Sequence, residues 1–126
     1  MYALFLVVLG GGIGAGIRHG MNIGAARWLG TDFPWGTFAI NVIGSFLIGV
    51  VAAYFAFRND AASQSLRLFL TTGILGGFTT FSAFSLDFAL LFERGEFWAA
   101  MLYVAGSVGL SLVAIFLGLW AVRSFA

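Results

Sequence analysis

The sequence TTGILGGFTTFSAFS, residues 71–85, lies inside an uncharged run that extends from Leu68 to Leu86 and is long enough to cross a bilayer. Its middle holds the pair Gly76-Gly77 and then two threonines, all of which are weak helix formers. A helix broken at the membrane midplane leaves main-chain groups without partners. Such a break survives only where it is buried in protein, lines a polar cavity or binds an ion. We therefore predict a helix broken near its midpoint, in a protein that binds or moves an ion.

The composition predicts an integral membrane protein. Of the residues, 61% are hydrophobic and 9% are charged, and the mean hydropathy is +1.03. The absence of cysteine excludes disulfides, thiolate catalysis and cysteine-based metal sites. A formal net charge of +1 provides no basic patch for nucleic acid. The N-terminus has no basic region or clear cleavage site, so we expect a retained first helix rather than a signal peptide.

Gaps between the charged residues divide the chain into four apolar segments. We expect an all-α protein with one four-helix transmembrane domain over residues 1–126. The predicted spans are residues 2–21, 35–57, 68–92 and 97–122. The connections between them, residues 27–34, 58–65 and 93–96, are polar or turn-forming.

The arginines are divided equally between the two sides of this domain. Three fall on the side of the termini and three on the other side: Arg58, Arg67 and Arg123 against Arg18, Arg27 and Arg94. Orientation in a membrane normally follows an excess of positive residues on one side. No excess exists here, so either the chain inserts in both orientations, which we favour, or another feature fixes its orientation.

The first predicted helix carries glycines at the spacing of close helix contacts. Pairs four residues apart occur at Gly10/Gly14, Gly12/Gly16, Gly16/Gly20 and Gly20/Gly24. Such pairs let two helix backbones approach closely in a membrane. The alternating glycines also superficially resemble a dinucleotide-binding fingerprint, but no strand precedes them, so we interpret them as a packing surface.

Several polar residues lie within the apolar spans. Asn41 stands in the second span, where it could bond to a neighbouring helix or face a pore. Tyr103, Ser107 and Ser111, at intervals of four, place three hydroxyls on one stripe of the fourth helix. Serines in membrane helices also bond back to their own helix, so this stripe has a second interpretation. Together these groups predict a neutral, donor-rich track.

Phe81 and Phe84 follow the expected break and share one helix face. Most of the 15 phenylalanines are expected simply to face lipid. These two differ because they flank Ser82 and adjoin the expected cavity. The edge of an aromatic ring is electropositive, so two such rings can support a small anion without a formal charge.

The ionisable residues give weaker signals. Asp87 is the only carboxylate near a span, and it lies close to the end of that span. Arg18 either extends to the interface or attracts anions at a pore mouth. His19, the only histidine, has no carboxylate nearby in the sequence and is expected at the surface. No catalytic triad, carboxylate pair or phosphate-binding loop is visible, so we do not expect an enzyme.

The motif GGFTTFSAF at residues 76–84, with WGT at 35–37 and NVIGS at 41–45, resembles the Fluc (CrcB-like) family of fluoride channels. The likeness covers essentially the whole chain. It implies an antiparallel, dual-topology homodimer in the inner (plasma) membrane, with no nucleic-acid partner. Such a dimer exports fluoride passively through two pores.

The resemblance also implies which residues act. The pore residues it implies are Asn41, Phe81, Phe84, Tyr103, Ser107 and Ser111, with Arg18 near the vestibule. It further implies a structural sodium ion at the dimer centre, bound by the backbone carbonyls of Gly76 and Thr79. Two carbonyls from each subunit would form a four-oxygen cage that suits a hard cation.

Two other functions remain to be weighed. A small dual-topology multidrug antiporter also has four short helices, but proton coupling needs a membrane-embedded carboxylate, and only Asp87 could serve. A non-transporting assembly subunit, packed through its glycines, leaves the midplane break and the donor track unexplained. Fluoride flux from purified protein in liposomes separates the three functions.

Overall fold

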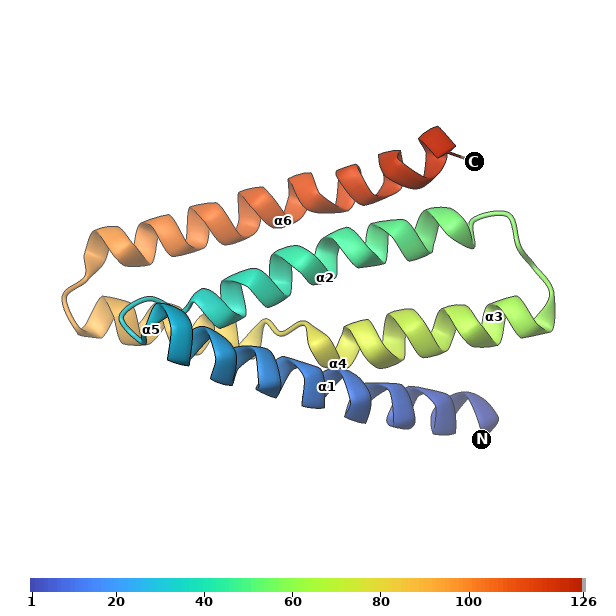
Figure 1. The fold of residues 1–126 in the computed structure, drawn as a ribbon, viewed down its shortest axis with the longest axis horizontal. Helices are drawn as coiled ribbons and strands as arrows, with labels where there is room; N and C mark the ends of the chain where they lie inside the picture. The colour runs from blue at the N-terminus through green and yellow to red at the C-terminus, as the bar shows by residue number, and fades with distance from the viewer. Residues whose placement is uncertain (126) are drawn as a thin grey trace.

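The computed structural model describes residues 1–125 as an all-helical chain. Three long helices, α1 (Tyr2–Leu29), α2 (Trp35–Tyr54) and α6 (Phe97–Phe125), run side by side with a composite segment that is third in chain order and is called the third segment below (Figure 1). That segment comprises α3 (Ala61–Leu68), the π-helix η1 (Phe69–Leu75), α4 (Gly76–Phe78) and α5 (Ser82–Glu93). Four stretches are long and apolar enough to cross a membrane: Tyr2–Leu29, Trp35–Tyr54, Ala61–Glu93 and Phe97–Phe125. The prediction of four potential spans is confirmed.

Two helix ends differ clearly from the sequence prediction. α1 continues to Leu29 rather than ending near Met21, because arginine and histidine interrupt the hydropathy pattern but not the helical hydrogen bonds. The third segment begins at Ala61, in the expected connection, because the Asp60 carboxylate accepts the main-chain N–H of Ser63 at 3.0 Å and caps the helix. The other predicted ends lie within three residues of the observed ones.

Glycines set the close approach of α1 to η1 and α4. A methyl group at Gly14 would clash with the main-chain oxygen of Ile74, and one at Gly77 would lie 2.9 Å from the Cα of Gly11. The predicted packing role of the first helix is therefore confirmed on this face. On the outward face an added methyl group would meet nothing within 4 Å in residues 1–125, and this holds for Gly12, Gly16, Gly20 and Gly24.

α2 and α6 lie along one another in the same manner (Figure 1). A methyl group at Gly118 would strike the main-chain oxygen of Phe46, and one at Gly49 would strike that of Ile115. Tight backbone contact of this kind maximises van der Waals attraction where lipid provides no hydrophobic drive between helices. The pair α2–α6 therefore forms a wall on which the polar residues of both helices are fixed.

The third segment changes conformation where α4 ends. Gly76, Gly77 and Phe78 are helical, Thr79 is extended with φ −83° and ψ 159°, and α5 begins at Ser82. Figure 1 draws this stretch as a thin loop between two helical pieces. The glycine pair therefore does not itself leave the helix, because Gly77 serves the contact with α1 and the change falls on the threonines that follow.

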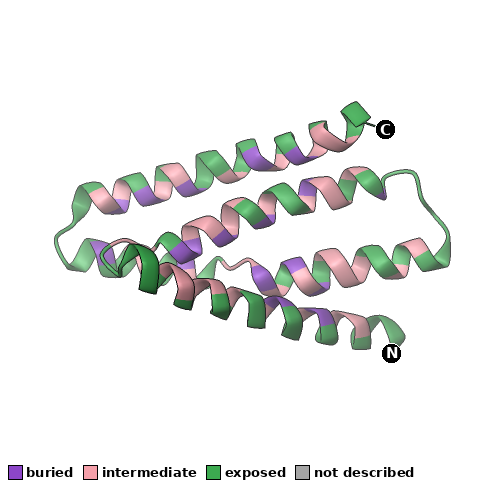
Figure 2. Cartoon of the chain, viewed as in Figure 1, coloured by how far each residue is buried: buried purple, intermediate pink, exposed green. Residues whose placement is uncertain are grey.

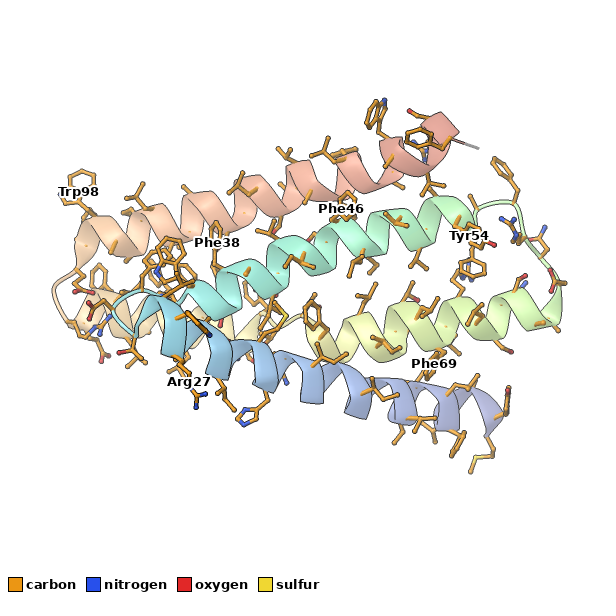
Figure 3. All side chains as sticks on the ribbon, in the orientation of Figure 1. Arg27, Phe38, Phe46, Tyr54, Phe69 and Trp98 are labelled. Carbon is orange, nitrogen blue, oxygen red and sulfur yellow. The ribbon has the colours of Figure 1, made fainter. Side chains whose placement is uncertain are left out.

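The outer surface of the chain is apolar. Buried residues lie on the sides of the helices that face one another, and most others are intermediate or exposed (Figure 2). Trp98 projects away from α6 and Arg27 away from α1 (Figure 3). Phe116 and Leu102 are among many large apolar side chains that are exposed. A surface of this kind is compatible with lipid and not with water.

Candidate functional site: a neutral cavity between α2, α5 and α6

One cavity of about 340 Å³ lies where the end of α4 and the start of α5 face α2 and α6. It is open on one side, and none of its lining residues carries a formal charge. The lining residues are Asn41, Gly44, Ser45, Ile48, Thr79, Thr80, Phe81, Phe84, Ser107, Val108 and Ser111. Five of the seven predicted pore residues therefore surround a single space.

Asn41 is bonded to the main chain of Thr80 on both sides of its amide. The Asn41 Nδ2 donates to the Thr80 carbonyl oxygen at 2.9 Å, and the Thr80 N–H donates to Asn41 Oδ1 at 2.9 Å. These two bonds satisfy main-chain groups that the interrupted helix cannot pair. Asn41 therefore bonds to a neighbouring segment, which is one of the two interpretations of this residue in the sequence. One N–H of the amide remains for another acceptor.

Ser107 and Ser111 line the cavity, and their hydroxyls have no partners in the described chain. Both Oγ atoms are buried, and neither has a hydrogen-bond partner among residues 1–125. The alternative in which these serines bond back to their own helix therefore does not hold in this structure. Burying a hydroxyl without a hydrogen-bond partner destabilises the folded protein by roughly 1–3 kcal/mol. The two serines are the strongest sign that the cavity holds a ligand.

Tyr103 stands one turn before Ser107 and does not line this cavity. Its side chain is fully buried, and its hydroxyl donates to Asp87 Oδ2 at 3.1 Å. Its ring centroid lies 5.0 Å from that of Phe84. Asp87 lines a second cavity, of about 410 Å³, at the end of the bundle. Tyr103 therefore contacts one wall residue of each cavity and lies between them.

Phe81 and Phe84 both line the first cavity but differ in their surroundings. Phe81 is 77% exposed, whereas Phe84 is 8% exposed and packs on Tyr103. Their ring centroids are 5.6 Å apart, with an interplanar angle of 46°. Phe84 is thus part of the protein interior, and Phe81 is the side chain that another molecule can cover.

Arg18 lies outside the lining of this cavity. It is half-buried on α1, one turn beyond Gly14, where an added methyl group would meet the main chain of Ile74 and Phe78. Four residues along a helix span about 6 Å, so Arg18 is near the level where the third segment is interrupted. His19 is exposed, in agreement with the expectation.

The carbonyl oxygens at the end of α4 lack donors. In a continuous helix the Thr80 N–H would donate to Gly76, but here it donates to Asn41. No hydrogen bond in the described part of the chain ends on the carbonyl oxygen of Gly76 or Thr79. Gly76 is also exposed on the surface of the chain. The end of α4 therefore presents free oxygens of the kind that a hard cation prefers.

A family model described as "CrcB-like protein, Camphor Resistance (CrcB)" matches residues 5–119. The chain belongs to the CrcB-like family. Among its relatives, a protein of Mesorhizobium japonicum named "Fluoride-specific ion channel FluC" is 57% identical and aligns over 98% of each chain. A protein of Nitrobacter hamburgensis named "Fluoride-specific ion channel FluC 2" is 59% identical over 94% of each chain. A third, from Rhodopseudomonas palustris, is 58% identical over 94% of this chain and 95% of its own length.

In this CrcB-like chain the sequence interpretation missed two parts of the site. Gly44, Ser45 and Ile48 line the cavity, and their spacing of three, four and seven residues after Asn41 could have predicted this. The bond between Asp87 and Tyr103 joins two helices, and no local pattern indicates it.

Proposed function

We propose that this CrcB-like chain is a fluoride-selective ion channel, not an enzyme, which lets fluoride leave the cytoplasm passively across the inner (plasma) membrane. The observation that carries the proposal is the neutral cavity with two partnerless hydroxyls, Ser107 and Ser111. Buried polar groups without partners require a ligand or water. The names of the relatives support fluoride as that ligand.

The cavity has the chemistry to replace the hydration shell of a small anion. Serine hydroxyls offer O–H donors, and Asn41 keeps one N–H that is not bonded to Thr80. The electropositive ring edges of Phe81 and Phe84 add weaker contacts. No lysine, arginine or histidine belongs to the lining, so the anion is not trapped by a fixed positive charge. Conduction needs such weak binding, because the ion must also leave.

We infer that two copies associate in antiparallel orientation and complete two pores. The cavity is open on one side, and Phe81 at its edge is largely exposed in the single chain. An open cavity that faced hydrocarbon would leave its polar groups without partners, so the site is incomplete without a second copy. The equal division of the arginines supports insertion in both orientations.

A structural sodium ion at the centre of that dimer belongs to the same proposal. The carbonyl oxygens of Gly76 and Thr79 have no donor in residues 1–125, and Gly76 faces outward. Neutral oxygens in this arrangement suit a hard cation. Bound there, the ion would satisfy the free carbonyls and offset the negative end of the dipole of the helical stretch α3–η1–α4.

The proton-coupled antiporter receives no support. Its mechanism requires a carboxylate that exchanges protons within the membrane, and the one candidate, Asp87, accepts the hydroxyl of Tyr103. The assembly-subunit alternative leaves the free hydroxyls unexplained.

Fluoride efflux from liposomes tests the proposal. Purified protein is reconstituted with potassium fluoride inside, and a potassium ionophore balances the charge that leaves. We expect fluoride to appear outside as soon as the ionophore is added, with matched chloride-loaded liposomes far slower. Efflux that instead requires a proton gradient would contradict a passive channel and return the antiporter to consideration.

A further inference from the structure

The amino-terminal end of α5 opens into the cavity, and most of its first N–H groups are free. Thr80, Phe81 and Phe84, which precede or form the first turn of α5, all line the cavity. A helix leaves its first four N–H groups without partners inside the helix. Here the Ala83 N–H donates to the Thr80 hydroxyl at 3.2 Å. The N–H groups of Phe81, Ser82 and Phe84 have no acceptor among residues 1–125.

Asn41 bonds to the main chain just before this turn. In a continuous helix the Phe84 N–H would donate to the carbonyl of Thr80, four residues earlier. That carbonyl instead accepts Asn41 Nδ2 at 2.9 Å. Asn41 thus bonds to Thr80 on both sides of its amide, and the Phe84 N–H has no acceptor among residues 1–125.

An independent observation on the facing helix also indicates a ligand. Ser107 on α6 is 4% exposed, and its hydroxyl has no partner in the described chain although it lines the same cavity. The Ser111 hydroxyl, one turn further along α6, is also buried and has no partner in the described chain. The cavity is therefore lined from two sides by residues with unpaired donors, main-chain N–H groups at the start of α5 and hydroxyls on α6.

We propose that the main-chain N–H groups at the amino end of α5, with the hydroxyls of Ser107 and Ser111, form the anion site of the cavity. The inference rests on the proposed function and specifies its chemistry. The ligand is a small monovalent anion, fluoride, held mainly by fixed main-chain donors at the positive end of a helix dipole. Main-chain donors cannot rotate away, so they favour an anion small enough to approach all of them together.

Fluoride titration of the wild-type protein tests the inference without any substitution. The full chain, labelled with ¹⁵N and reconstituted in lipid, is titrated with sodium fluoride and, separately, with sodium chloride. We expect the amide resonances of Phe81, Ser82 and Phe84 to move with fluoride and to move little with chloride. The Ala83 amide, already bonded to Thr80, is the internal control and should move least. If the resonances of these amides do not move when fluoride is added, the inference is wrong.

Replacing single peptide bonds with esters tests the same donors by function. An ester at Ser82 or at Phe84 removes one free N–H and keeps the side chain, and we expect fluoride flux to fall about ten- to a hundred-fold in a dimer of normal size. An ester at Ala83 removes an N–H that is already paired with the Thr80 hydroxyl, so this variant should keep most of the flux. Wild-type flux in the Ser82 and Phe84 esters would reject the anion site and leave the channel intact. Absence of fluoride flux in the wild type would reject the channel itself.

Discussion

Replacing Gly77 with alanine tests a close contact between α1 and the third segment. The added methyl group would lie 2.9 Å from both the carbonyl carbon and the Cα of Gly11, and closer still to the carbonyl oxygen. Carbon atoms in contact prefer a separation of about 3.5–4.0 Å, so α1 would have to move away by roughly 0.6–1.1 Å. Every atom involved on the Gly11 side belongs to the main chain, which no change of rotamer can move aside.

The size of the effect follows from a matched pair of variants. Overpacking of this kind costs about 1–3 kcal/mol. Gly12→Ala makes the same chemical change on the outward face, where nothing lies within 4 Å in the described chain. Both variants gain roughly 1 kcal/mol from the better helix propensity of alanine. That gain cancels in the comparison, so Gly77→Ala should be less stable than Gly12→Ala by about 1–3 kcal/mol.

Unfolding of the two variants in the same detergent, followed by circular dichroism, measures this difference. Gly77 lies two residues before Thr79, which lines the cavity, so fluoride efflux from liposomes should also fall in Gly77→Ala and stay normal in Gly12→Ala. If the two variants were equally stable and equally active, the close approach of α1 to α4 would be refuted.

Three further predictions follow from the site. Phe81→Ile should lower fluoride efflux at least about tenfold with little change in stability, because isoleucine lacks the electropositive ring edge. Phe92→Ile, at an exposed position, is the control. Normal efflux in Phe81→Ile would reject the aromatic contact. The double variant Ser107→Ala/Ser111→Ala should be as stable as the wild type or more stable, because it removes two hydroxyls without partners in the described chain. Its fluoride efflux should fall. Unchanged efflux would show that these hydroxyls take no part in fluoride conduction. A cysteine in place of Ser63 should react with an impermeant reagent from both sides of intact cells, and labelling from one side alone would contradict insertion in both orientations.

The spans could be predicted from the sequence because a helix that crosses lipid needs a long run of apolar residues, and the hydropathy of the sequence shows such runs directly. The end of α1 was missed because hydropathy falls at Arg18 while helical hydrogen bonding continues to Leu29. The start of α3 was missed because a polar segment with an Asp60 cap forms a helix without being apolar. Hydropathy therefore locates the membrane and not the ends of the helices.

The site was predicted as a set of residues and not as a set of bonds. Asn41 and the two serines were found from polarity inside apolar spans, and the structure brings them to one cavity. The partner of Asn41 could not be predicted, because Thr80 lies 39 residues away and takes part through its main chain. Sequence also could not decide whether the serines bond to their own helix, since both arrangements suit the same spacing.

The reversal potential of the purified protein in a planar bilayer tests the central claim most directly. With a tenfold gradient of sodium fluoride and equal chloride on both sides, a passive fluoride channel reverses near the fluoride equilibrium potential, about 59 mV in magnitude. The potential should stay there when a pH gradient is added. A reversal potential near zero, or one that follows the proton gradient, would contradict passive, fluoride-selective conduction.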